Sequence, residues 1–229
     1  MIKILAYFLI SLILYFLINL YFYIITHPSY KVQPYSEVKD KLKTGDIVLF
    51  HALDNIFPTI MACYFTHIGI IYEHDDGKKY LFEAFNPKMT PYYPKEISNG
   101  IICSELENRL TTYRGYICYK ELGLPLKEEQ KNQFKKFINY AQKNMFYYNN
   151  VVKNYYKKVI YNETLQTGTN CAELVYLSLI SLNLLHPNEF SNNNKYHLKW
   201  LTELTNVCNN YYKEPVYVYS EYYQDPLIL

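Results

Sequence analysis

The first feature of the chain is a long apolar stretch near its start. Residues 4–25 contain no charged side chain, and only Ser11 and Asn19 are strongly polar. A helix of that length, at about 1.5 Å per residue, would cross the roughly 30 Å hydrocarbon core of a bilayer. A cleaved signal peptide would have a shorter apolar region followed by small residues, whereas this stretch ends in aromatic ones. The pattern therefore predicts a transmembrane anchor over residues 1–26.

After a polar connector over residues 27–43, the pattern changes to short apolar runs separated by turn residues. Runs of this length that are rich in β-branched and aromatic side chains predict strands. The predicted strands cover residues 47–50, 66–73, 79–85, 100–103, 115–120 and 215–219. The turn sequence Asp75-Asp76-Gly77 between the second and third runs predicts a hairpin.

Other segments show the spacing of an amphipathic or buried helix. The predicted helices cover residues 54–64, 125–145, 171–185 and 195–208, and one more begins at Ser104-Glu105-Leu106-Glu107, which has the capping-box form. Residues 146–164 carry no pattern that assigns them to a helix or a strand. Together these elements predict an α+β fold, a small antiparallel sheet packed with helices, in one domain over residues 44–229.

Composition and charge exclude several classes of protein. With 7 Gly and 10 Pro among 229 residues, the chain has too few breakers to be disordered. A net charge of +2 argues against a nucleic-acid-binding protein. Five Cys is an odd number without framework spacing, as expected in a reducing compartment. Only Lys3 precedes the apolar stretch whereas four lysines lie in residues 27–43, which favours a cytosolic carboxy-terminal domain.

One cysteine lies where a helix is predicted to begin. If Asn170 is the N-cap, Cys171 is the first helical residue and Glu173 is the capping partner. A thiol there lies at the positive end of the helix dipole, which favours the nucleophilic thiolate, and the neighbouring N–H groups can form part of an oxyanion hole. The alternative is that Cys171 is only a small buried hydrophobic residue.

A histidine and a glutamate are candidate partners for this thiol. His67 lies in a predicted strand, and Glu83 is a lone carboxylate inside the apolar run of residues 79–85, where it would be costly without a partner. A Cys/His pair needs a third polar group that holds the imidazole ring, and Glu83 is the candidate for that role. The residues thus form a candidate catalytic set, with Cys171 as the nucleophile and His67 as the base.

The register of the predicted hairpin decides whether Glu83 can reach His67. A two-residue turn at Asp76-Gly77 would put the two side chains on opposite faces of the sheet. A three-residue loop with Gly77 in the left-handed conformation instead pairs Gly69 with Glu83, which makes Glu83 a diagonal neighbour of His67 on the same face. Because Gly comes last in Asp75-Asp76-Gly77, we predict the three-residue loop.

Other polar residues and cysteines are weaker candidates. Cys63 and His67 are four positions apart, but no second ligand pair lies near them, so neither a metal nor a cofactor is expected. His51 can line the site or lie at the edge of the core, and Asp46 is expected to cap the turn before the first strand. The remaining cysteines are expected to be packing residues: Cys103, Cys118 and Cys208. The chain has neither a G-x-S-x-G elbow nor a phosphate-binding glycine loop, which argues against a serine hydrolase or an NTPase.

Four short motifs, taken together, resemble one protein family over roughly residues 43–190. They are Thr44-Gly45-Asp46-Ile47-Val48, Thr66-His67-Ile68-Gly69-Ile70, Phe82-Glu83-Ala84 and Asn170-Cys171-Ala172-Glu173-Leu174-Val175. The chain resembles the circularly permuted, NlpC-type papain-like thiol hydrolases, among them the bacterial YiiX-like proteins and their poxviral relatives. The resemblance implies a permuted papain-like fold with Cys171 as nucleophile, His67 as general base and then acid, and Glu83 as the group that fixes the ring.

The sequence therefore predicts a membrane-anchored cysteine hydrolase or acyltransferase that acts on an amide or ester bond through a thioester acyl-enzyme. The expected partners are the lipid bilayer and a substrate that is an acyl lipid, a lipid-modified protein or a peptide, with no nucleic acid. We expect a single-pass membrane protein whose catalytic domain lies in the cytosol. The resemblance implies a viral source, in which case the domain would lie in the host cytoplasm or in the virion.

Two other hypotheses come from different classes of protein. The first is a catalytically inactive papain-like protein that serves as an interaction or virion membrane protein. The second is a structural membrane protein without a site, which would leave the capped Cys171 helix and the buried Glu83 unexplained. The reactivity of the Cys171 thiol discriminates between the enzyme and both alternatives.

Overall fold

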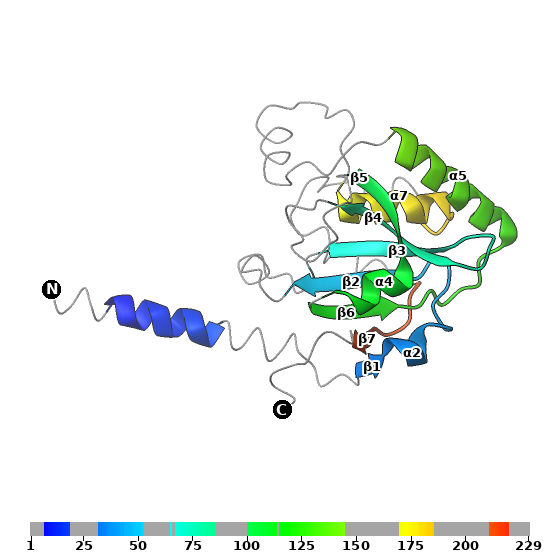
Figure 1. Cartoon of the computed structure of the whole chain (residues 1–229). Helices are drawn as coiled ribbons and strands as arrows, with labels where there is room; N and C mark the ends of the chain where they lie inside the picture. The colour runs from blue at the N-terminus through cyan, green and yellow to red at the C-terminus, as the bar shows by residue number, and fades with distance from the viewer. Residues whose placement is uncertain are drawn as a thin grey trace, which may run out of the picture.

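The computed structural model describes a seven-stranded sheet with helices on both of its faces (Figure 1). The residues that it describes are 7–18, 32–52, 65, 67–85, 100–113, 115–144, 170–185 and 211–219. The strands are β1 (Val32–Pro34), β2 (Ile47–Ala52), β3 (His67–Glu73), β4 (Lys79–Phe85), β5 (Gly100–Glu105), β6 (Gly115–Lys120) and β7 (Val216–Tyr219). The helices are α2 (Tyr35–Val38), α4 (Leu106–Thr111), α5 (Glu128–Asn144), α7 (Cys171–Ser181) and one over residues 7–18.

The sheet is larger than the predicted one and is not wholly antiparallel. The strand order is β1-β7-β6-β2-β3-β4-β5, and the β1–β7 pair is parallel whereas every other pair is antiparallel. The prediction of a small antiparallel sheet was therefore wrong, although the mixture of helices and a sheet is present. The difference comes from the connector over residues 27–43, which contains β1 and α2. Pro34 is tolerated in β1 because that strand lies at the edge of the sheet.

The predicted transmembrane anchor is also wrong. The structure describes helix over residues 7–18 near the start of the chain. Across the part of the chain that the structure describes, no helix combines the length and the apolar character needed to span a membrane. The predicted location as a single-pass membrane protein depended on this anchor and is therefore wrong as well.

The sheet carries a hydrophobic core on each face. In β2, Ile47 and Leu49 join the core beneath α5 and α7, whereas Val48 and Phe50 join the core beneath α2 and α4. Because both faces are covered, the strand is an unbroken apolar run rather than an alternating one. This arrangement places α7 on the opposite side of the sheet from α4 (Figure 1).

The start of β2 is fixed by a buried carboxylate, as the sequence predicts. Asp46 accepts hydrogen bonds from the backbone N–H groups of Lys43, at 2.9 Å, and Leu122, at 2.8 Å. Burial raises the pKa of Asp46 to about 6. The residue thus ties the turn before β2 to the segment after β6, which is a structural role.

Several predicted segments cannot be compared with the structure. The helices over residues 54–64 and 195–208 and the unassigned segment 146–164 lie outside the described residues. The helix predicted over residues 125–145 is present as α5, and the predicted strands over residues 79–85 and 115–120 have the predicted bounds.

Gly69 provides a test of how tightly β3 packs. A methyl group added at Gly69 would lie 2.8 Å from Cγ of Leu81, which is fully buried. We expect Gly69→Ala to lower the free energy of unfolding by about 1–3 kcal/mol, because the core must shift to admit the methyl group. Urea denaturation of the full chain measures this loss.

A second substitution tests whether crowding is the cause. Leu81→Ala removes the atoms that the new methyl group would meet, so the double variant should lose less stability than the sum of the two single losses. Additive losses would contradict the steric explanation.

Candidate active site

The first component of the site is the amino terminus of α7. Asn170 is the N-cap, with an extended backbone, and its Oδ1 accepts a hydrogen bond from the backbone N–H of Glu173 at 2.8 Å. The helix begins at Cys171, whose side chain is nearly buried. The sequence-based prediction of this cap is confirmed. The first N–H groups of a helix have no acceptor within it, so those of Cys171 and Ala172 lie beside the thiol as donors.

The second component is the β3–β4 hairpin, and its register is the predicted one. Ile70 pairs with Phe82, and the pairing continues to Glu73 and Lys79. The loop is closed by a hydrogen bond from the N–H of His74 to the carbonyl of Lys78. Gly77 has a φ of 79°, in the left-handed region where glycine is favoured. The three-residue loop over 75–77 is therefore confirmed.

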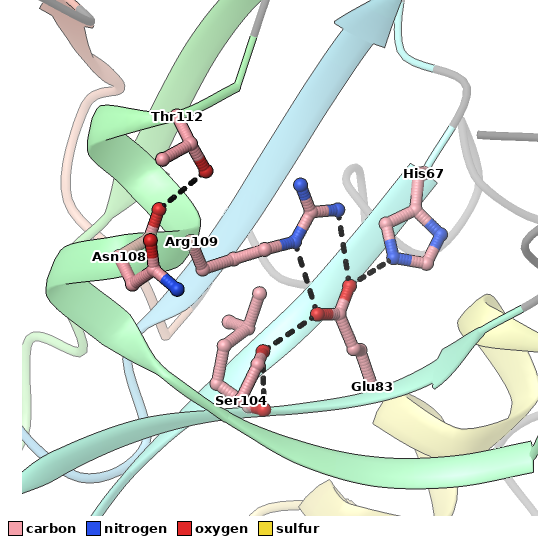
Figure 2. A network of polar contacts seen from close by, with 7 residues as sticks. His67, Glu83, Ser104, Asn108, Arg109 and Thr112 are labelled. Atoms are coloured by element: carbon pink, nitrogen blue, oxygen red, sulfur yellow. Dashed lines mark hydrogen bonds and ion pairs between the residues drawn. The ribbon is translucent and has the colours of Figure 1, made fainter. Parts of the chain in front are cut away.

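This register brings His67 and Glu83 into direct contact. Nε2 of His67 lies 2.6 Å from Oε2 of Glu83, and the two side chains are 11% and 0% exposed. Figure 2 shows the imidazole ring at the end of β3, turned toward the carboxylate on β4. An ionised carboxylate only accepts hydrogen bonds, so Nε2 carries the proton in this contact.

The other ring nitrogen of His67 is left for the thiol. Interaction with Cys171 is among the causes that raise the pKa of His67, and α7 packs against β3. Because Glu83 occupies Nε2, Nδ1 is the ring nitrogen that remains for the thiol. His67 is the first residue of β3, where its ring contacts Glu83 of β4 and interacts with Cys171 at the start of α7. The three candidate residues are thus brought together in the order Cys171, His67, Glu83.

The environment favours the charged forms of both His67 and Glu83. Burial alone lowers the pKa of His67, but the interactions with Cys171 and Glu83 outweigh this effect and raise the pKa from 6.5 to about 9. Burial alone raises the pKa of Glu83, but the charge of Arg109 and the hydrogen bond with His67 hold the pKa well below its usual value of 4.5. At neutral pH the site therefore contains an imidazolium beside a carboxylate.

Two further residues hold Glu83, and neither was identified from the sequence. Arg109 donates from Nε to Oε1 at 3.0 Å and from Nη2 to Oε2 at 3.3 Å, and Oγ of Ser104 donates to Oε1 at 2.9 Å (Figure 2). One signal could have identified Arg109. It is one of only two arginines in a chain with 21 lysines, and arginine is the residue that binds a carboxylate through two parallel hydrogen bonds.

The predicted role of Ser104 as a helix cap is wrong. α4 begins at Leu106, and its N-cap is Glu105, which makes no side-chain capping bond. Ser104 instead lies in β5, and its hydroxyl group bonds the buried carboxylate of Glu83. Bonding the carboxylate stabilises the fold more than capping the helix would, because a buried carboxylate without hydrogen bonds is costly.

An aromatic wall closes the site on the α4 side. The guanidinium carbon of Arg109 lies 4.3 Å from the ring centre of Phe50, and the ring of His67 lies 5.6 Å from the same centre. Tyr113 packs edge-on against Phe50 at 4.9 Å. These rings exclude water from the Arg109–Glu83 pair, which strengthens its electrostatic interaction.

The other candidate residues do not join this cluster. Burial raises the pKa of both Cys103 and Cys118 to about 12, so these thiols stay protonated. Cys63, Cys208 and the side chain of His51 lie outside the described residues. In the described ranges, His, Cys, Asp and Glu side chains form no group of three that could hold a metal ion.

Comparisons with known proteins add one distant likeness. No family model matches the chain, and no curated protein matches it. A crystal structure of the metalloprotein YiiX from Escherichia coli O157:H7 is similar, with 16% sequence identity and a TM-score of 0.43, over 76% of this chain and 88% of that chain. A likeness of this size bears on neither the fold nor the chemistry, so the site is judged by its own geometry.

Proposed function

We propose that this protein is a cysteine hydrolase or acyltransferase that acts on an amide or ester bond through an acyl-enzyme on Cys171. One observation carries the proposal, namely the buried imidazole of His67, which contacts the carboxylate of Glu83 and whose pKa is raised by its interaction with Cys171. A nucleophile, a base within hydrogen-bond reach and a third group that orients the base are the requirements of nucleophilic catalysis.

The first half of the proposed reaction forms a thioester. The Cys171 thiolate attacks the carbonyl carbon, a C–S bond forms, and the carbonyl oxygen becomes an oxyanion that the N–H groups at the start of α7 stabilise. The tetrahedral intermediate collapses as the bond to the leaving amine or alcohol breaks. His67 gives its Nδ1 proton to that leaving group.

The second half releases the acyl group and restores the thiolate. Neutral His67 takes a proton from water, or from the hydroxyl or amine of an acceptor, as that oxygen or nitrogen attacks the thioester carbon. The C–S bond then breaks and leaves Cys171 as a thiolate beside the imidazolium of His67. Acyl lipids, lipid-modified proteins and peptides all offer a carbonyl for this cycle, and they form the substrate classes of the proposal.

Alkylation of Cys171 tests the proposal directly. A thiolate paired with an imidazolium persists at pH values where an ordinary thiol, with a pKa of about 8.5, is protonated. We expect iodoacetamide to alkylate Cys171 in the full chain at about pH 6 at least tenfold faster than it alkylates free cysteine. Peptide mapping by mass spectrometry identifies the modified residue.

The chain supplies its own controls for this experiment. Cys103 and Cys118, whose thiols stay protonated, should remain unmodified at the same pH. His67→Ala should bring the rate at Cys171 down to that of an ordinary thiol. If wild-type Cys171 reacts no faster than free cysteine, the enzyme hypothesis fails and an inactive interaction protein becomes the better interpretation.

A further inference from the structure

We propose that Arg109 is a positioning residue of this site, which holds Glu83 in one orientation and shares its charge so that His67 can release a proton during the reaction. This inference rests on the proposed function of the Cys171–His67 pair. Arg109 acts on His67 through Glu83, whose carboxylate both residues contact.

The first step of the argument is the geometry of the carboxylate. Oε1 of Glu83 accepts from Nε of Arg109 and from Oγ of Ser104, and Oε2 accepts from Nη2 of Arg109 and from Nε2 of His67. These bonds to both oxygens fix the plane of the carboxylate. A fixed Oε2 in turn fixes the plane of the imidazole, and with it the direction in which Nδ1 points.

The second step is the rigidity of Arg109 itself. Its side chain is 3% exposed, and its guanidinium group packs on the faces of Phe50 and Tyr113, whose centres lie 4.3 and 5.2 Å away. The residue projects from α4, where Oγ1 of Thr112 bonds the carbonyl of Asn108 in the last turn (Figure 2). A lysine could not replace it fully, because an ammonium group cannot supply two parallel donors in one plane.

The third step concerns charge. Glu83 and Arg109 together are neutral, so the imidazolium of His67 faces a balanced pair rather than a lone buried carboxylate. A lone carboxylate would hold the proton of His67 more strongly, and the proton must leave His67 when the leaving group departs. Arg109 thus makes His67 a better acid than Glu83 alone would allow.

Two other titratable groups among the described residues lie near Glu83, and neither carries a charge in the pH range used below. Cys103, from β5, has its pKa raised to about 12, and burial also raises the pKa of Tyr113, which follows α4, far above its usual value. Both therefore stay neutral. Cys171, from α7, is the other titratable group that acts on the pKa of His67 besides Glu83.

The test is the pH profile of Cys171 alkylation in the full chain, measured with iodoacetamide between about pH 5 and pH 10. The upper step of the profile reports the loss of the His67 proton, and NMR titration of the His67 ring checks the assignment. We expect Arg109→Gln to move this step up by about one pH unit, because a positive charge near the imidazolium has been removed.

Arg109→Lys separates the charge from the geometry. It keeps the charge, so the upper step should stay near the wild-type position. It loses the two-pronged contact, so the alkylation rate of the paired thiolate near neutral pH should fall by about tenfold as the ring loses its fixed orientation. Circular dichroism and urea denaturation show which variants are folded at each pH.

The outcomes distinguish this inference from the proposed function. If wild-type Cys171 lacks enhanced reactivity at about pH 6, the proposed function fails first. If the wild type is reactive and both folded variants keep its rate and its upper step, the role of Arg109 is structural only and the inference is overturned. If Arg109→Gln does not fold, Arg109→Lys decides the question by itself, and a wild-type alkylation rate in that variant overturns the inference.

Discussion

Cys171→Ala should abolish the acyl-enzyme and lower turnover of any substrate that the wild type accepts by about 1,000-fold or more. The reason is that the other described thiols cannot take over the covalent bond, since those of Cys103 and Cys118 stay protonated. The measurement uses the full chain with a panel of acyl lipids, lipid-modified peptides and unmodified peptides. Mass spectrometry monitors an acyl group on Cys171, and product release gives the turnover rate.

Matched variants show that the effect belongs to Cys171. Cys118→Ala removes a buried thiol of the same size, and it should leave the rate near that of the wild type although it costs some stability. Cys171→Ser keeps the shape of the helix start but replaces the thiolate with a much poorer nucleophile, so it should be nearly as inactive as the alanine variant. Full activity in Cys171→Ala would refute the proposed mechanism.

Glu83→Gln should lower the free energy of unfolding by about 3–5 kcal/mol at neutral pH, which is the second large effect that we expect. The substitution removes the carboxylate that pairs with the buried guanidinium group of Arg109. It also removes the acceptor that holds His67, so alkylation of Cys171 near pH 6 should slow together with the loss of stability. Urea denaturation and the alkylation rate are measured on the same samples.

A double variant separates the two consequences of losing Glu83. In Glu83→Gln with Arg109→Met the buried charges are removed together, and replacing a buried ion pair by neutral groups is often close to neutral in stability. We expect this variant to recover most of the lost stability but not the reactivity of Cys171. Recovery of both would show that Glu83 acts only through the stability of the fold.

The pH dependence of the stability difference follows from the pKa of Glu83. Its pKa in the folded chain is lowered from 4.5, so the carboxylate contributes stability that is fully present above pH 4.5 and is lost as the pH falls toward its folded pKa. The gap between the wild type and Glu83→Gln should therefore be full at neutral pH and shrink in acid. A gap that widens on acidification would contradict this assignment.

The parts of the site that could be predicted from the sequence are those with local causes. The loop at Asp75-Asp76-Gly77 fixes the hairpin register through the left-handed preference of glycine, and that register brings Glu83 to His67. The cap at Asn170 depends on a residue three positions away. Each of these features depends on a few neighbouring residues, so a local pattern contains enough information to predict it.

The parts that could not be predicted depend on distant residues. Arg109 and Ser104 meet Glu83 from positions 26 and 21 residues further along the chain, and no local pattern indicates such a contact. The capping-box form at Ser104 even indicated a different use of its hydroxyl group, because local motifs do not account for a buried charge on the neighbouring strand. The parallel pairing of β1 with β7 joins residues that are far apart in the sequence. The spacing of hydrophobic residues along the chain does not predict such a pairing either.

That pairing has a consequence for the order in which the protein can assemble. β1 is the first of the described strands to leave the ribosome, but its partner in the sheet is β7, the last of them, which fits between β1 and β6. Contacts between such distant segments form late in folding because the loop that joins them must first be closed. His67, Glu83 and Arg109 are likewise made well before Cys171. The growing chain therefore cannot assemble the proposed catalytic set until α7 has been translated, about a hundred residues after β3.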